Sequence, residues 1–183
     1  MVKLILLGES RSETLERFLT ETLSRHFSLT VCTGPRAFSA GTGTPLLLLS
    51  PPELFAADLR GALFLARNGA RLPQELHLPD DAVVIVSSEE ENQLLRLARL
   101  QVQTVTCGLS CKDTVTFSSR SEETAVISLM RSVCGLSGEA VEPMDLPVSF
   151  PPRSGDYPLL ACAAVLLLTG ALSGKPPAKY FQL

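Results

Sequence analysis

The sequence has no tryptophan, only two tyrosines and two histidines, and few charges, since 19% of its residues are acidic or basic. The shortage of aromatic rings argues against a surface on which nucleic-acid bases stack. Lysine and arginine never exceed two in five consecutive residues, and the formal net charge is −3. A binder of the phosphate backbone needs a clustered positive surface, so we expect no nucleic-acid partner. Disorder is also excluded, because 45% of the residues are hydrophobic.

Long apolar runs are missing as well. The N-terminal run covers only Leu4 to Leu7, whereas a signal peptide needs ~7–15 apolar residues, so the run predicts a buried strand. The strongest run, Leu159 to Leu168, ends at Thr169-Gly170, well short of the ~20 residues that cross a bilayer. We therefore expect a cytoplasmic protein with no membrane partner.

The cysteines are odd in number and widely spread, which is typical of reduced thiols in a cytosolic protein. Cys107 and Cys111 have a CxxxC spacing, but no second Cys or His pair stands nearby to complete a metal site, and we predict none. With only two histidines, a Ser-His-Asp triad has few ways to form. We therefore predict no catalytic residue. The five cysteines are Cys32, Cys107, Cys111, Cys134 and Cys162.

Buried strands alternate with amphipathic helices in the first part of the chain. One helix is predicted after a cap at Ser10 or Ser12, with an apolar stripe from Leu15 to His26, and another from about Glu89 to Leu100. This alternation predicts an α/β fold with a mostly parallel, Rossmann-like or P-loop-like sheet and helices on both faces. Ala62–Ala66 is either a sixth strand or part of a helix. The other predicted strands are Val2–Leu7, Leu29–Thr33, Leu46–Leu49, Val83–Val86 and Val102–Thr106.

From Thr114 the pattern changes to short alternating segments, which predict a small antiparallel β region over about 113–150. The following helix, 158–172, is apolar on all sides and must be covered on all sides. We predict that it lies between the main sheet and the antiparallel strands, or partly in a homodimer interface. A single domain is expected over 1–173, followed by a loosely ordered tail over 174–183.

The loop from Gly8 to Ser12 is a candidate anion or nucleotide site. It lies between a buried strand and a helix start, where free N–H groups and the helix dipole favour anions. Its candidate residues are Gly8, Ser10, Arg11 and Ser12, and Arg11 would supply positive charge. The alternative is structural: Ser10 or Ser12 caps the helix, and Glu13 completes a capping box with Ser10.

Glu89 and Glu90 form a second candidate position. They follow a predicted buried strand at its carboxyl end, where doubly wound folds bind their ligands. The alternative is that Ser87-Ser88 caps the following helix and the acidic residues belong to its first turn.

Three stretches follow one another between about residues 80 and 173: VVIVSSEEENQLLRLARL, then QVQTVTCGLSCKDTVTF, then EAVEPMDLPVSFPPRSGDYPLLACAAVLLLTGAL. Their order resembles the central domain of the Mur ligases, the ATP-dependent amide-bond-forming enzymes of peptidoglycan synthesis. In that family a strand and helix precede a strand with a glycine turn, three antiparallel strands, a Gly-x-His-Asn loop and an alanine-rich helix. The resemblance implies the fold of that domain and an ancestry related to bacterial cell-wall enzymes.

The sequence departs from that family at its phosphate loop. The family's loop is similar to Gly-Thr-x-Gly-Lys-Thr/Ser, and only its first glycine is matched here, by Gly8. Ser12 stands at the lysine position and Glu13 at the magnesium-binding hydroxyl position. Converging amides and a lysine hold phosphates in such loops, whereas carboxylates repel them. The resemblance therefore implies a degenerate P-loop.

Two further family features are altered. Glu89-Glu90 stands for an Asp pair, and Gly155-Asp156-Tyr157-Pro158 replaces the His-Asn loop. We therefore expect a non-catalytic protein that needs no cofactor and acts by binding a small ligand or a protein partner. One alternative is a nucleotide-dependent, ligase-like enzyme that uses ATP and Mg, with Arg11 in place of the lysine and Glu89 and Glu90 on the metal. Another is a subunit that completes its site with a partner chain.

Overall fold

The computed structural model describes residues 1–9, 14–172 and 180–183. Contacts within the chain divide it into two compact units, unit 1 (Met1–Thr104) and unit 2 (Val105–Leu183). The secondary structure confirms the predicted α/β class, with a mostly parallel sheet and an antiparallel region. The prediction of a single domain over 1–173 stays a prediction.

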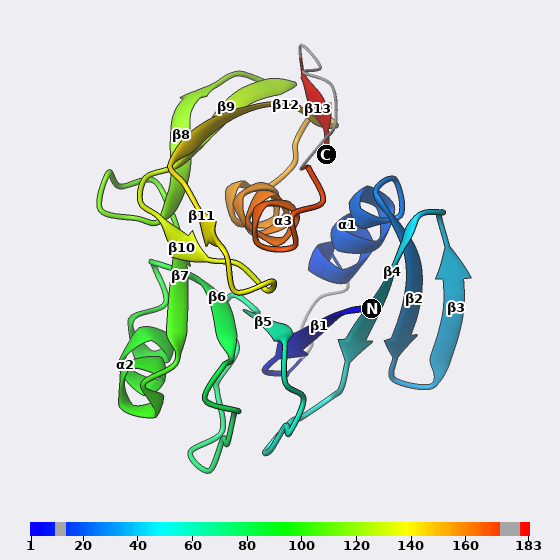
Figure 1. The fold of residues 1–183 in the computed structure, drawn as a ribbon, viewed down its shortest axis with the longest axis vertical. Helices are drawn as coiled ribbons and strands as arrows, with labels where there is room; N and C mark the ends of the chain where they lie inside the picture. Colours follow the sequence, from blue (N-terminus) through cyan, green and yellow to red (C-terminus); the bar gives the residue numbers. More distant parts are fainter. Residues whose placement is uncertain (10–13, 173–179) are drawn as a thin grey trace. The chain divides into compact units, whose positions relative to one another are not determined.

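Unit 1 contains a six-stranded sheet in the order β6–β5–β1–β4–β2–β3 (Figure 1). All neighbours are parallel except the β2–β3 hairpin. Each predicted strand of this unit forms, and Ala62–Ala66 is a strand. The bounds are β1 Val2–Leu7, β2 Phe27–Thr33, β3 Arg36–Ala40, β4 Thr44–Ser50, β5 Ala62–Ala66 and β6 Val83–Ser87.

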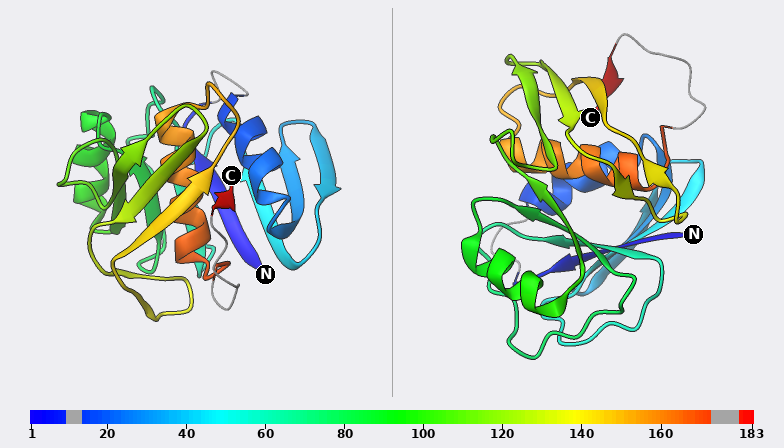
Figure 2. Two further views of the ribbon diagram at one scale, coloured as in Figure 1. Left: turned by 90° about the horizontal axis from the view of Figure 1, so that it is seen from above. Right: turned by 60° about the vertical axis from the view of Figure 1, so that its left-hand side comes forward.

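The strand β3 was not predicted from the sequence. Its side chains are almost all exposed, so the segment carries none of the apolar alternation on which strand prediction depends. Backbone pairing with β2 forms it, with Thr33 opposite Arg36 across the Gly34-Pro35 turn. Figure 2 shows this hairpin as the outer edge of the unit 1 sheet.

The helices of unit 1 are α1 (Thr14–Leu23) and α2 (Glu91–Leu100). Both are shorter than predicted. The first ends before His26 because the chain tightens into three-residue turns after Leu23. The second begins after Glu90, which has no side-chain capping bond, so the predicted serine cap is wrong. Ser87 instead accepts a hydrogen bond from the Glu89 amide at 3.3 Å.

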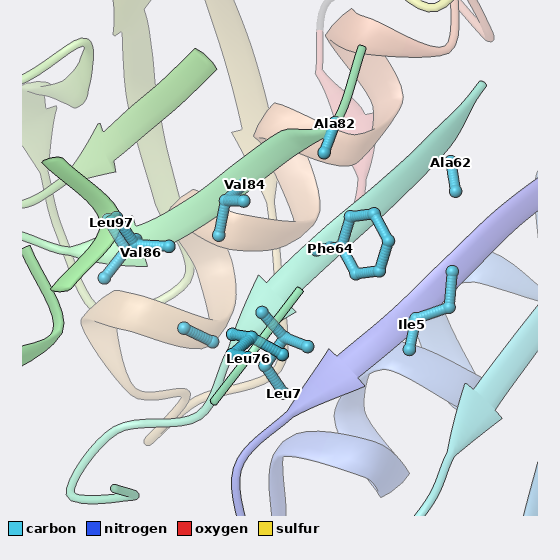
Figure 3. Packing of buried hydrophobic residues seen from close by; sticks show 10 residues of the cluster. Ile5, Leu7, Ala62, Phe64, Leu76, Ala82, Val84, Val86 and Leu97 are labelled. Atoms are coloured by element: carbon cyan, nitrogen blue, oxygen red, sulfur yellow. The ribbon is translucent and has the colours of Figure 1, made fainter. Parts of the chain in front are cut away.

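One core of unit 1 lies on the sheet face that α2 covers (Figure 3). Ile5 and Leu7 of β1 point into it, and Leu97 of α2 packs against it. Because side chains alternate along a strand, Leu4 and Leu6 point to the opposite face, which α1 covers at β2. The cluster is Ile5, Leu7, Ala62, Phe64, Ala66, Leu76, Ala82, Val84, Val86 and Leu97.

Unit 2 contains the predicted antiparallel region. Its strands lie in the order β13–β12–β9–β8, and Cys107 at the end of β7 pairs with Val115 of β8. The β8–β9 and β9–β12 pairs are antiparallel, and β10 and β11 form a separate two-stranded sheet. The bounds are β7 Gln103–Cys107, β8 Val115–Arg120, β9 Thr124–Leu129, β10 Val133–Cys134, β11 Ala140–Val141, β12 Met144–Ser149 and β13 Phe181–Gln182.

The end of the chain corrects the prediction of a loose tail. Phe181 and Gln182 pair with β12, and Leu183 is 1% exposed. The Leu183 amide donates to the Ser149 carbonyl at 2.8 Å. The free edge of β12 supplies backbone partners that local composition does not reveal. The rest of the predicted tail lies outside the described residues.

The helix α3 (Asp156–Leu168) lies against β8 in unit 2 (Figures 1 and 2). Every residue from Leu159 to Leu168 is buried, which confirms that the helix is covered on all sides. It ends four residues before the predicted Leu172, because Gly170 adopts a φ of 66°. Within the described part of the chain, no helix has both the length and the apolar character needed to cross a bilayer.

Candidate functional site

The five parallel strands of the unit 1 sheet all end on the same side, which forms the carboxyl edge of the sheet. β1 lies between β4 and β5, and the chain builds the sheet on one side of β1 before crossing to the other. In open α/β sheets, ligands bind at the carboxyl ends of strands where the strand order reverses in this way. Thr33 and Ser50 end β2 and β4 in register with each other. Arg67 follows β5 directly.

An ion pair is buried at this edge. Arg67 is 5% exposed through its side chain, and its Nη2 lies 2.8 Å from Oε1 of Glu16, in the first turn of α1. The same nitrogen donates to Oγ of Ser50 at 2.6 Å, and Nη1 donates to the Gly8 carbonyl. Both terminal nitrogens of the guanidinium are therefore bonded within the protein.

The carboxylate of Glu16 is held from three sides. Ser50 donates its hydroxyl to Oε1 at 2.6 Å, and Thr33 donates to Oε2 at 2.9 Å. Burial by itself raises the pKa of Glu16, but the hydrogen bonds from Ser50, Arg67 and Thr33 and the charge of Arg67 outweigh it. The pKa therefore lies below its usual value of 4.5, and the group is ionised at neutral pH. Hereafter these four side chains are called the strand-end network: Glu16, Thr33, Ser50 and Arg67.

Gly8 joins this network to the loop after β5. It has a φ of 89°, and a Cβ at this position would come 2.5 Å from the Cβ of Ala70. The backbone there requires glycine for its conformation and for this close approach. Buried Gln93 of α2 holds the same loop by donating to the carbonyls of Arg67 and Ala70, both at 2.7 Å. The network is thus part of a rigid, internally bonded edge.

Of the four residues predicted for the anion loop, the structure describes only one. Gly8 is at the network, whereas Ser10, Arg11 and Ser12 lie outside the described residues. Glu90 accepts a hydrogen bond from the Gly69 amide at 2.5 Å, next to the Ala70 that Gly8 contacts, and Glu89 is exposed. The role of these residues in binding an anion or a metal stays a prediction.

The network itself was missed, although the sequence carried two signals for it. Glu16 stands three residues before Leu19 and seven before Leu23, so it occupies the stripe that α1 buries. Arg67 directly follows the fully buried strand β5. A charge in a buried stripe needs a partner of opposite sign. Only the tertiary structure pairs the two, because they are 51 positions apart.

The thiols and histidines form no competing site in the described residues, where no cluster of metal-ligating side chains occurs. None of the five cysteines, all of which lie in the described residues, forms a disulfide. Cys107 and Cys162 are buried, Cys32 is partly buried, and Cys111 and Cys134 are exposed. Burial, followed by the charge of Asp113, raises the pKa of Cys107, so this thiol is unreactive.

In unit 2 the segment Gly155-Asp156-Tyr157-Pro158 starts a helix and anchors it. Asp156 is in the first turn of α3, where its Oδ1 lies 2.7 Å from Nη1 of Arg120. The Arg120 guanidinium also lies 5.4 Å and 5.7 Å from the ring centres of Phe117 and Phe150. These contacts tie β8 and the end of β12 to the start of α3.

Comparison with known proteins supports the fold. The sequence matches no protein-family model and no curated protein. Among solved structures, MurF from Acinetobacter baumannii matches with a TM-score of 0.53 and 14% identity, over 98% of this chain and 46% of its own. A MurF ligase from Thermotoga maritima in complex with ADP gives 0.51 and 14%, over 96% and 47%.

A third solved structure, a UDP-N-acetylmuramoyl-L-alanyl-D-glutamate–2,6-diaminopimelate ligase, gives a TM-score of 0.51 at 11% identity, over 96% of this chain and 44% of its own. The chain therefore spans about half the length of the solved structures that it matches. The likeness confirms that it shares a fold with a part of Mur ligases, as the sequence resemblance implies.

Proposed function

We propose that the chain is a non-catalytic protein with a Mur-ligase-like fold that acts by binding a small ligand or a protein partner. The observation that carries the proposal is the strand-end network. It fills the edge of the sheet where such folds bind ligands with a charge pair that the protein supplies itself.

The network is poorly suited to bind a nucleotide phosphate. The two terminal nitrogens of Arg67 already serve Glu16, Ser50 and the Gly8 carbonyl, so the cation is neutralised. A phosphate placed ~4 Å from the Glu16 carboxylate would meet a repulsion of about 4 kcal/mol per charge near a protein surface. Breaking the pair to free Arg67 would leave a buried charge unpaired, at a further cost of about 3–5 kcal/mol.

The sequence of the loop after β1 supports the same proposal. Between Gly8 and Thr14 there is no lysine and no second glycine, whereas phosphate loops depend on both. We accordingly propose that no ATP, magnesium or other cofactor is required. The proposal also includes a cytoplasmic location and partners other than nucleic acid or membrane, in keeping with the net charge of −3.

The test is nucleotide binding and turnover with the full chain. We expect no heat of binding for Mg-ATP or Mg-ADP at millimolar nucleotide and no phosphate release above a buffer control. A heat of binding would overturn the proposal, and so would phosphate release that is lost in the Arg11→Ala variant. That variant separates an altered enzyme, which needs Arg11 for its phosphates, from a contaminating activity that does not change.

A second variant tests the physical reason. Glu16→Gln removes the carboxylate charge while it keeps the size and the hydrogen-bonding oxygen of the side chain. If the internal pair excludes anions, this variant gains measurable pyrophosphate binding, and the matched surface variant Glu21→Gln does not. Equal behaviour of the two variants would contradict the idea that Glu16 blocks the site.

Light scattering on an eluting column determines whether the chain is a homodimer.

A further inference from the structure

A cavity of about 450 Å³ lies on the α2-covered face of the unit 1 sheet. Parallel strands of one sheet, such as β4 and β5 on either side of β1, are usually joined through a helix that covers the sheet. Here residues 51–61 make the connection without one. Within the described residues, this segment forms one isolated β-bridge, between Ala56 and His77. The cavity lies between this segment and the ends of β1, β2 and β4, where Ile5, Cys32 and Leu49 face it.

The lining of the cavity is apolar surface that the fold leaves incompletely covered. Leu49, Leu54, Ala57 and Leu59 pack against the core cluster of Figure 3, yet each is only partly buried. All four also line the cavity. Apolar surface in a concavity is favourably removed from water by a ligand of matching shape. The volume falls within the range of about 300–1,000 Å³ that is usual for small-molecule sites.

The polar groups at the cavity restrict what can enter. Ser50 borders it, but its hydroxyl is committed to Glu16 and Arg67. Among residues 1–9, 14–172 and 180–183, no lysine or arginine lines it, and Asp58, which is exposed, is the one charged lining residue. An anion would therefore find no partner and one repelling carboxylate. A hydroxyl or amine on the ligand would find an acceptor at Asp58.

We propose that this cavity binds a small aromatic or aliphatic molecule that carries one hydroxyl or amine donor, with the donor directed to Asp58. The proposal names a ligand class for the binding function proposed above and rests on it. A protein partner would bury about 800 Å² on each side, whereas a concavity of this volume admits a small molecule.

The first test is titration of the full chain with the fluorescent aromatic amine 1-aminoanthracene. We expect enhanced, saturable fluorescence that benzylamine or benzyl alcohol reverses at least five-fold more effectively than benzoate. In the Asp58→Asn variant this preference should fall at least three-fold while 1-aminoanthracene still binds. Absence of saturable binding, or an unchanged preference in Asp58→Asn, would overturn the proposal.

A second test fixes the location. Ala57→Phe places a ring in the cavity and should weaken the dye at least ten-fold, whereas Ala98→Phe, on the exposed surface of α2, should leave affinity unchanged. Bound dye should also slow alkylation of half-buried Cys32 at least three-fold and leave the exposed Cys111 unaffected, as read by peptide mass spectrometry. The Cys32 readout uses the unaltered chain, so it decides the matter even if Ala57→Phe does not fold. Equal alkylation rates with and without dye would refute the site.

Failure here is distinguishable from failure of the proposed function. If the dye binds and ATP is turned over, the non-catalytic assignment is contradicted and the cavity site is still supported. No dye binding with no ATP turnover would remove the cavity site alone.

Discussion

Replacing Arg67 with methionine tests the strand-end network most directly. The variant removes the cation from a side chain that is 5% exposed and leaves the Glu16 carboxylate, 11% exposed, without its charge partner. It also leaves the buried Gly8 carbonyl without the donor that Arg67 provides. Ser50 and Thr33 still donate to Glu16, so the carboxylate keeps part of its solvation.

The expected loss in the free energy of unfolding is about 3–5 kcal/mol, the usual cost of breaking a buried pair from one side. For a chain of this size the midpoint of thermal unfolding would fall by about 6–20 °C, at about 2–4 °C per kcal/mol. Urea denaturation followed by circular dichroism measures the loss. The double variant Glu16→Met/Arg67→Met should recover most of it, because an apolar pair of similar volume often replaces a buried ion pair without loss.

Two results would refute this reasoning. A loss below about 1 kcal/mol in Arg67→Met would place the pair in the class of surface ion pairs. Additive losses in the double variant would show that the two side chains do not depend on each other. The control is Arg17→Met, which removes an exposed arginine from α1 and should change stability little.

Three further predictions concern stability. Because the pKa of Glu16 is lowered in the folded protein, its ionised carboxylate stabilises the fold above the unfolded pKa of about 4.5. This stabilisation is lost as the pH falls through the lower folded pKa. Urea titrations should therefore show a fall in the free energy of unfolding below pH 4.5, and the fall should be smaller in Glu16→Gln. Gly8→Ala should cost about 1–3 kcal/mol by differential scanning calorimetry, because φ is 89° and the new Cβ meets Ala70 at 2.5 Å; no change would mean that the loop after β1 moves freely. Leu167→Asp should cost several kcal/mol by the same measurement, because Leu167 is 4% exposed and its replacement buries an unpaired charge; melting within about two degrees of the parent would contradict the buried position of α3.

Buried strands were the most predictable part of the fold. Val2–Leu7 was bounded correctly because the apolar run Leu4–Leu7, which ends at Gly8, is typical of a buried strand. The strands β3 and β13 escaped prediction for the opposite reason. β3 is almost entirely exposed and β13 has only two residues, so neither Arg36–Ala40 nor Phe181–Gln182 forms the continuous apolar run that marks a buried strand.

The candidate site was only partly predictable. Gly8 was identified because it ends a strand before a helix, which is a local pattern. Arg67 and Glu16 were not identified, because they form an ion pair across 51 positions of the chain, which no local pattern reveals. Local patterns therefore pointed to this edge of the sheet but not to the buried charges that lie there.

The central position of β1 in unit 1 has a consequence for how this unit folds. β1 is the first segment of this unit, yet Val2 pairs with Leu46 and Lys3 pairs with Ala62. Neither neighbour exists until residues far along the chain have been made, so β1 must wait unpaired while they are synthesised. The chain between β1 and its partner strands must close into a long loop before these pairings can form, which slows folding compared with a helical bundle. During that interval the apolar run Leu4–Leu7, which is buried in the finished protein, is exposed to water and to other chains. The order of synthesis therefore gives the centre of the unit 1 sheet a period in which it can aggregate.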